Sequence, residues 1–407
     1  MAPLTSNSPV SIQGRFFRRG STRFLIKGVV YRLHEQDVQD PLVDARLQDL
    51  ERDIHLFREL RLNVLFVDHI DPEQTHDRAM KALADAGIYV LVSLPTAAST
   101  TDGAGTTTTF RPYSTQLLED CFATVDCMSQ FSNTLGVIVA NGALSTIYST
   151  SAAPMIKTVI RDIKRYMFTA AKTLDQRQLP VGYSASNGRL ILKTTYDYFT
   201  AGPADEAIDF FCYANFNWCG KSTMQLAGYE AELKQFSNTR IPIFFSQYGC
   251  NLGACGKRIF QETTAIYSPA MTSVFSGGIA YEFYNSNQNR TGHWGYGLVQ
   301  QVTTPVGRGL TILADFISLK ARLEAAEAGA AKSAEKVALD CEARVRRSKE
   351  IPPLSSHWKA GHALPYSLAD WASIRKGLDD KAWLEVRIEE AEDIERLLIA
   401  RPSAVLA

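Results

Sequence analysis

The sequence has little cysteine, no excess of either charge and no long hydrophobic run. Its 7 cysteines among 407 residues are sparse and odd in number, unlike the disulfide framework of a small secreted domain. The 43 basic side chains match the 43 acidic ones, which argues against binding nucleic acid or anionic membranes through a positive surface. No apolar stretch has the length of a membrane helix. We therefore expect a globular protein that binds neither nucleic acid nor membrane.

The two ends of the chain also lack targeting signals. The N-terminal twenty residues contain no apolar segment behind a basic start, as a secretory signal requires. The C-terminal apolar run is too short for a removable lipid-anchor tail. Together with the few cysteines, these ends predict a cytoplasmic protein.

Eight short apolar runs rich in β-branched and aromatic residues are spread along the first 320 residues. Between them lie segments with apolar residues at helical spacing, i, i+3, i+4 and i+7. Eight alternations with continuously apolar strands predict the α/β class and a (β/α)8 TIM-type barrel. Functional groups in that fold lie at the C-terminal ends of the strands. The runs are 24–31, 62–67, 89–94, 135–140, 179–183, 209–214, 241–246 and 277–283.

Two regions depart from this pattern. Residues 96–112 are rich in Thr, Gly and Ala, which predicts a mobile loop at the rim of the barrel. From residue 319 the chain becomes a tract of Ala, Glu, Lys and Arg with few large apolar residues. We therefore predict a barrel over 1–318 and a charged helical extension over 319–407, without catalytic groups and removable by proteolysis.

Several blocks stand in one order along the chain, among them FLIKGVVY, LNVLFVDHIDP, HDRAMKALADAGIYVL, NTLGVIVAN, IPIFFSQYGCN and SGGIAYEF. From about Arg15 to Val299 this series resembles the fungal cell-wall β-1,3-glucanosyltransferases of glycoside hydrolase family 72. The resemblance implies a barrel that acts on β-1,3-glucan. It also implies an alternative to the cytoplasm, namely secretion or the cell surface.

The two catalytic positions that the resemblance implies carry no acid. Retaining transglycosylases use two carboxyl groups about 5 to 5.5 Å apart. In the family these are glutamates ending the fourth and seventh strands, and their positions here hold Gly142 and Gln247. Neither residue serves as acid, base or carboxylate nucleophile. The resemblance therefore points to a degenerate member with no intact catalytic residue, inactive on β-1,3-glucan.

Other positions that the resemblance places around the sugar have also changed. The family's polar groups are replaced by Arg32, Phe66, Asp68, Ser93, Ala214 and Phe216, while Tyr31, Asn141, Tyr281 and Tyr296 are retained. Together with Gln247, these residues are expected to form the pocket at the barrel mouth. Arg32 and Asp68 end neighbouring strands, where the two charges can meet. Alternation along the strand is expected to turn Glu282 away from Tyr281.

The cysteines differ from the family pattern as well. The resemblance implies that two family disulfides are lost, since Leu50, Ala79 and Ala201 stand at cysteine positions. Cys219 and Cys250 remain, either as a disulfide or as two buried thiols. No cysteine stands in a Cys, His and acid arrangement that the sequence reveals, so no nucleophilic thiol is expected. We also expect no metal and no cofactor, because neither ligand spacing nor a phosphate loop is found.

Three functions stay open from the sequence. The first is a non-catalytic carbohydrate-binding or regulatory pseudoenzyme. The second is a repurposed barrel enzyme acting on a small non-glycan substrate, and the third is a residual β-1,3-glucan transglycosylase of the cell wall. Each places a glucan or small-molecule ligand at the barrel mouth. The oligomeric state is left open.

Overall fold

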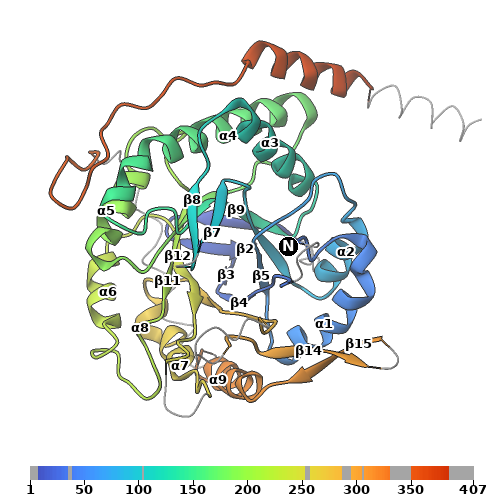
Figure 1. Ribbon diagram of the computed structural model, residues 1–407, viewed down its shortest axis with the longest axis vertical. Coiled ribbons are helices and arrows are strands. Elements are labelled where there is room, and N and C mark those ends of the chain that lie inside the picture. Colours follow the sequence, from blue (N-terminus) through green and yellow to red (C-terminus); the bar gives the residue numbers. More distant parts are fainter. Residues whose placement is uncertain are drawn as a thin grey trace, which may run out of the picture.

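A closed barrel of eight parallel strands forms the centre of the protein (Figure 1). The computed structural model describes residues 8–34, 39–102, 105–252, 257–286, 295–304, 307–330 and 350–384. The predicted (β/α)8 barrel is confirmed, with the closed order β10-β11-β12-β13-β4-β5-β6-β9. Its strands are β4 (Ile26–Val30), β5 (Val64–Val67), β6 (Tyr89–Ser93), β9 (Thr134–Asn141), β10 (Val181–Ala185), β11 (Phe210–Asn215), β12 (Ile243–Tyr248) and β13 (Gly277–Ala280).

Helices surround the barrel as an outer ring (Figure 1). Apolar side chains on both faces of each strand fill two layers, one inside the barrel and one between strands and helices. The helices are α1 (Leu47–Glu59), α2 (Asp77–Asp85), α3 (Thr115–Ser129), α4 (Ala153–Leu174), α5 (Arg189–Thr200), α6 (Tyr229–Phe236), α7 (Gln261–Ile266), α8 (Pro269–Thr272) and α9 (Ala314–Ala330), with short 3-10 helices at Asp44–Arg46 and Tyr148–Ala152.

The N-terminal end of the barrel is closed by a small antiparallel sheet. Its strands are β1 (Val10–Gln13), β2 (Phe16–Arg19) and β3 (Thr22–Phe24). The fully buried ring of Phe17 lies 5.9 Å from the Phe210 ring and 6.0 Å from the Phe244 ring. Because this apolar plug blocks one end, a ligand reaches the barrel from the C-terminal ends of the strands.

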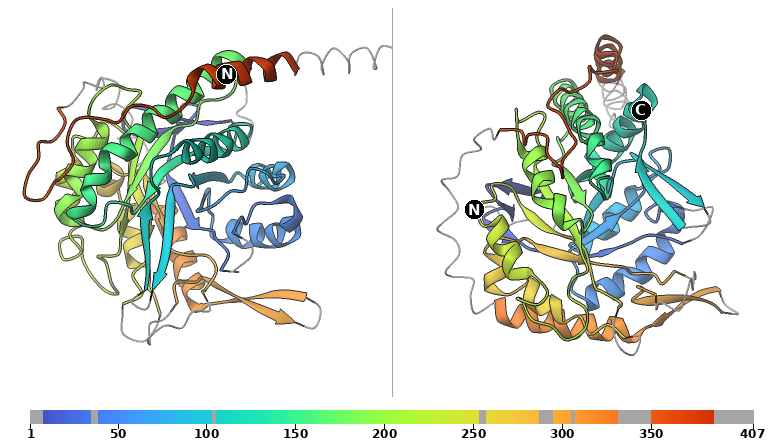
Figure 2. Two further views of the ribbon diagram at one scale, coloured as in Figure 1. Left: turned by 45° about the horizontal axis from the view of Figure 1, so that its top comes forward. Right: turned by 60° about the vertical axis from the view of Figure 1, so that its left-hand side comes forward.

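The segment predicted as a rim loop forms a hairpin instead. Strands β7 (Ala97–Asp102) and β8 (Gly105–Phe110) pair antiparallel (Figure 2, cyan). Threonine is β-branched and favours extended backbone, and this preference outweighs the small-residue content of the segment. A second hairpin, β14 (Val299–Thr304) and β15 (Gly307–Ile312), projects from the opposite part of the ring (Figure 1, orange).

The predicted boundary between residues 318 and 319 falls inside helix α9. Phe316, Leu319 and Leu323 of this helix are buried against the barrel, so its first turns belong to the barrel wall. The sequence did not indicate this apolar stripe, because Ala, Glu and Lys make up most of the surrounding segment. Residues 331–349 and 385–407 of the predicted extension lie outside the described residues.

A segment we call the strap, residues 350–370, crosses the outside of α5 and α4 and leads into a helix over 371–384 (Figures 1 and 2, red). Trp358 is fully buried, with its ring 5.2 Å from that of Tyr198 on α5. Further contacts join Lys359 N to Thr150 Oγ1 at 2.9 Å and Arg161 Nη1 to the Pro365 carbonyl at 3.1 Å. The strap is thus packed on the barrel rather than separate from it. No described helix is both long and apolar enough to cross a membrane.

Candidate functional site

A cavity of about 790 Å³ opens at the C-terminal ends of the barrel strands. Strand-end residues from around the barrel line it, because parallel strands present their carboxyl ends at one edge. The site residues named from the sequence that line it are Arg32, Asp68, Ser93, Asn141, Gly142, Phe216 and Gln247. Gln39, Thr96, Arg111 and Asn187 also line it. They come from loops and the base of the β7–β8 hairpin, where no strand-end pattern marks them.

The two expected catalytic positions face this cavity without a carboxylate. Gly142 follows β9 with φ of +69°, and a Cβ placed there would meet no atom within 4 Å. Gln247 lies in β12, in register with Ala214 of β11. Asp68 carries the one carboxylate among the described lining residues. The pair of acids required for double displacement is therefore absent from the cavity.

A buried polar bridge lies beside Gly142 and Gln247. The Ser184 hydroxyl is 2.8 Å from Asn141 Oδ1 and 2.9 Å from Ser246 Oγ, which ties three strands together. The Ser93 hydroxyl is also buried but has no hydrogen-bond partner within the described part of the chain. A buried hydroxyl without a partner costs about 1–3 kcal/mol.

Charged groups meet on one side of the cavity. Arg32 Nη1 lies 3.5 Å from Asp68 Oδ2, and Arg32 Nε donates to Glu282 Oε2 at 2.6 Å. His34 Nε2 lies 3.3 Å from the same Glu282 oxygen. Arg32 also bonds the Tyr281 hydroxyl. The side chains of Glu282 and Tyr281 therefore meet at the same guanidinium group instead of pointing to opposite faces of the strand, as the sequence predicted. The strand alternation used in the prediction ends at Ala280, where β13 ends.

Three aromatic rings form the adjoining wall. Phe216 lies 6.0 Å from the Tyr281 ring and 5.8 Å from the Tyr296 ring, and the two tyrosine rings are 5.1 Å apart. Buried Arg258 bonds the carbonyls of Tyr281 and Tyr296 and pairs with Asp315 at 2.6 Å. This network holds the aromatic wall against the end of β13.

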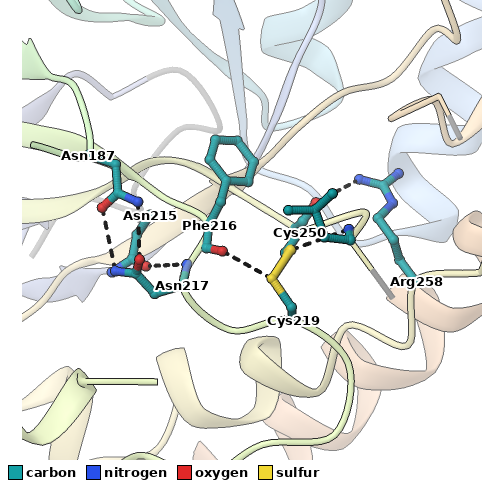
Figure 3. The surroundings of a disulfide bond; sticks show 9 residues. Asn187, Asn215, Phe216, Asn217, Cys219, Cys250 and Arg258 are labelled. Carbon is teal, nitrogen blue, oxygen red and sulfur yellow. Dashed lines mark hydrogen bonds between the residues drawn. A yellow bond between two sulfur atoms is a disulfide. The ribbon is translucent and has the colours of Figure 1, made fainter. Parts of the chain in front are cut away.

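A disulfide fixes the loop that carries Phe216 (Figure 3). Cys219 and Cys250, which the sequence left as a disulfide or two thiols, are joined by a disulfide. It links the segment after β11 to the segment after β12, close to Gln247. Asn217 of this loop also pairs with Asn187, which follows β10 (Figure 3). The side-chain amide of each residue donates a hydrogen bond to the amide oxygen of the other.

Buried Glu232 supports this loop from helix α6. It accepts hydrogen bonds from Tyr213 at 3.0 Å and from Asn215 at 2.8 Å, and Asn215 Oδ1 in turn accepts from Asn217 N at 3.1 Å. Burial raises the pKa of Glu232 to about 7, and the hydrogen bonds from Tyr213 and Asn215 oppose that rise.

This raised pKa predicts that the free energy of unfolding falls as pH rises from about 4.5 to about 7. The contribution is fully present below the unfolded pKa and is lost through the folded one, with an amplitude of roughly 3 kcal/mol. When the free energy of unfolding is measured in urea at several pH values across this range, it should fall less steeply with pH in Glu232→Gln than in the wild type. Glu230→Gln on the exposed face of the same helix is the matched control. Buried Glu262 contributes a pH dependence of the same sign to both proteins. If the pH dependence of the free energy of unfolding is the same in Glu232→Gln as in the wild type, the raised pKa of Glu232 is contradicted.

Four residues predicted for the pocket are not among those that line the cavity. Tyr281 and Tyr296 belong to the adjoining aromatic wall, and the other two lie elsewhere. Tyr31 is buried between barrel and helices, where its hydroxyl donates to Asp53 Oδ2 at 2.9 Å and its ring packs 5.3 Å from Phe57. Phe66 is fully buried in the apolar cluster inside the barrel. Side chains alternate along a strand, so a register displaced by one residue sends a side chain to the other face. Within the described residues, no three His, Cys, Asp or Glu side chains form a metal-binding group.

The fold agrees with the comparisons with known proteins. A family model described as glucanosyltransferase, glycoside hydrolase family 72, matches residues 2–327. The chain belongs to this family. It is 36% identical over 318 residues to 1,3-beta-glucanosyltransferase gel1 of Aspergillus fumigatus, covering 78% of this chain and 66% of that protein. It is also 36% identical over 323 residues to 1,3-beta-glucanosyltransferase GAS5 of Saccharomyces cerevisiae, covering 78% and 62%.

A solved structure of Saccharomyces cerevisiae Gas2p, in complex with laminaritriose and laminaritetraose, matches with a TM-score of 0.74 and 30% identity. The match covers 90% of this chain and 78% of that chain. The chain spans just under two thirds of the length of the curated glucanosyltransferases it matches.

Family membership corrects the predicted location. The expectation of a cytoplasmic protein is wrong, because the glucanosyltransferase family is extracellular. Sparse cysteine does not exclude secretion, because a barrel of this size is stabilised by its apolar core and needs few disulfides. The disulfide between Cys219 and Cys250 agrees with an oxidising compartment.

Proposed function

We propose that this barrel is a carbohydrate-binding member of the glucanosyltransferase family that lacks transferase chemistry. The observation that carries the proposal is the pairing of Gly142 and Gln247 on one cavity with no carboxylate at either position. A covalent glycosyl intermediate needs a nucleophilic carboxylate and a second carboxyl as acid and then base. Neither group is available at these two strand ends.

The remaining cavity chemistry suits a saccharide. Ser93, Asn141 and Gln247 offer neutral hydroxyl and amide groups to sugar hydroxyls, and Phe216 offers an aromatic face to the apolar face of a sugar ring. Phe66 lies inside the barrel and adds no apolar side chain to the cavity. A glutamate-to-glutamine mutant of Gas2p is described in complex with laminaritetraose and laminaripentaose. In that relative, loss of a carboxylate is compatible with oligosaccharide binding.

Calorimetric titration with laminarihexaose tests the proposal. We expect saturable binding without product formation, and at least a tenfold weaker affinity for Phe216→Ala, equivalent to about 1.4 kcal/mol. Leu226→Ala, in an exposed residue that does not line the cavity, is the matched control and should bind as the wild type does. Absence of binding at millimolar laminarihexaose would overturn the carbohydrate-binding proposal and leave the small non-glycan ligand as the alternative.

A further inference from the structure

The structure brings together a cysteine, a histidine and an acid that are far apart in the sequence. His76, just before α2, places Nε2 2.9 Å from Asp40 Oδ2, and its Nδ1 lies 3.6 Å from Cys127 Sγ near the end of α3. The sequence spacing of 36 and 51 residues gives no sign of this arrangement. It is the order of groups found at activated nucleophiles, with a base beside the thiol and an acid orienting the base.

The two supporting groups are buried and held in place. His76 is 2% exposed and Asp40 is 4% exposed, whereas Cys127 is partly exposed. Asp40 accepts the backbone N–H groups of Leu42 at 2.8 Å and Asp71 at 2.7 Å, which fixes its carboxylate toward the imidazole. Cys127 is thus the most exposed residue of the three, and the imidazole and carboxylate beside it are buried.

The charge state of His76 agrees with this role. Burial lowers the pKa of His76, but hydrogen bonds to Asp40 and Cys127 raise it more strongly, to about 10. An imidazolium stabilises a neighbouring thiolate, which is the nucleophilic form of cysteine. The carboxylate of Asp126, next to Cys127 in the sequence, is held by other partners. It accepts hydrogen bonds from Tyr166 of α4 at 2.7 Å and from Gln176, which follows α4, at 2.9 Å.

We propose that Cys127 is a nucleophilic thiol, activated by His76 and Asp40, that undergoes exchange with small disulfides in the oxidising surroundings of the protein. Cys127 reacts as the thiolate of a thiolate–imidazolium pair, in which His76 holds the proton, and its sulfur attacks one sulfur of the disulfide. The S–S bond of the small molecule breaks as the new one forms, and the second sulfur leaves with the electron pair and takes the proton from His76. Cys127 is thereby oxidised and one small thiol is released. Cys127, His76 and Asp40 are not among the residues that line the barrel cavity.

Other cysteines of the same chain provide internal comparisons. Cys121 lies on the same helix, is fully buried, and burial raises its pKa to about 12. Burial also raises the pKa of Cys212 inside the barrel. Both thiols are protonated and buried at neutral pH. Their modification in the same sample therefore measures the general reaction of thiols with the oxidant, against which the reaction of Cys127 can be compared.

The test uses oxidised glutathione, with each cysteine followed by peptide mass spectrometry. We expect Cys127 in the native protein to form the mixed disulfide at least tenfold faster than Cys121, releasing one reduced glutathione per adduct. Native Cys127 should also react about tenfold faster than Cys127 in protein unfolded in urea, although unfolding exposes it fully. A cysteine that is merely accessible would react faster, or equally fast, after unfolding.

Two variants examine the supporting groups. His76→Gln should reduce the native rate of Cys127 to that of the unfolded chain. Asp40→Asn should reduce it less, because it keeps one of the two oxygens with which Asp40 accepts the N–H groups of Leu42 and Asp71. A folded His76→Gln protein with an unchanged rate would overturn the proposal. If His76→Gln does not fold, the comparison of native with unfolded wild type decides, and a native rate no higher than the unfolded rate overturns it.

Discussion

Laminari-oligosaccharides incubated with the purified protein are expected to be recovered unchanged. Acid–base assistance alone contributes about 10²- to 10⁴-fold to such reactions, and this chain lacks that group and the nucleophile together at Gly142 and Gln247. Chromatography of end-labelled oligomers, followed over days, is the measurement. Products longer or shorter than the starting oligomer would contradict the expectation.

Restoring both acids is expected to leave activity poor. At Gly142 the backbone has φ of +69°, a conformation that costs a residue with a Cβ about 1–2 kcal/mol, so Gly142→Glu is strained even though the cavity has room for the side chain. Arg32, Asp68 and Phe216, which line the cavity, would still differ from the residues that the family resemblance implies at those positions. The double variant Gly142→Glu with Gln247→Glu should therefore remain far below an active relative assayed in parallel. Activity equal to that relative would show that the two acids alone were missing.

Trp358→Ala is expected to destabilise the protein by about 3–5 kcal/mol, because it empties the site of a fully buried ring packed on Tyr198. This expectation replaces the prediction that residues 319–407 are removable without effect. The free energy of unfolding in urea is the measurement, and Trp383→Ala, with a side chain 62% exposed, is the control. A change below 1 kcal/mol in Trp358→Ala would show that the strap contributes little to the barrel.

The strap also explains a limit of the sequence pattern. Trp358 stands in a segment with no helical or strand periodicity, so nothing local indicates burial. It is buried because α5 presents Tyr198 at the same place, and Lys359 and Arg161 bond to neighbouring elements there. Tyr198 and Trp358 are about 160 positions apart in the sequence. No window used to detect periodicity contains both residues.

The sequence by itself determined the barrel and its chemical deficit. Strands of a parallel barrel are buried on both faces, so they appear as continuous apolar runs that can be counted. Catalytic capacity depends on functional groups, and neither Gly142 nor Gln247 carries a carboxyl group that could serve in a double displacement. The family resemblance implied that Arg32, Asp68, Ser93, Asn141 and Phe216 belong to the pocket, and these residues line the cavity.

Only the tertiary structure decided where single side chains point and which distant groups meet. Tyr31 and Phe66 sit at or next to strand ends, yet one lies against the helices and the other inside the barrel, because a single step along a strand reverses the face. The β7–β8 hairpin and the burial of α9 depend on pairing and packing partners elsewhere in the chain. Cys127, His76 and Asp40 become neighbours because three separate connections of the barrel converge, which is a property of the closed fold and of no local pattern.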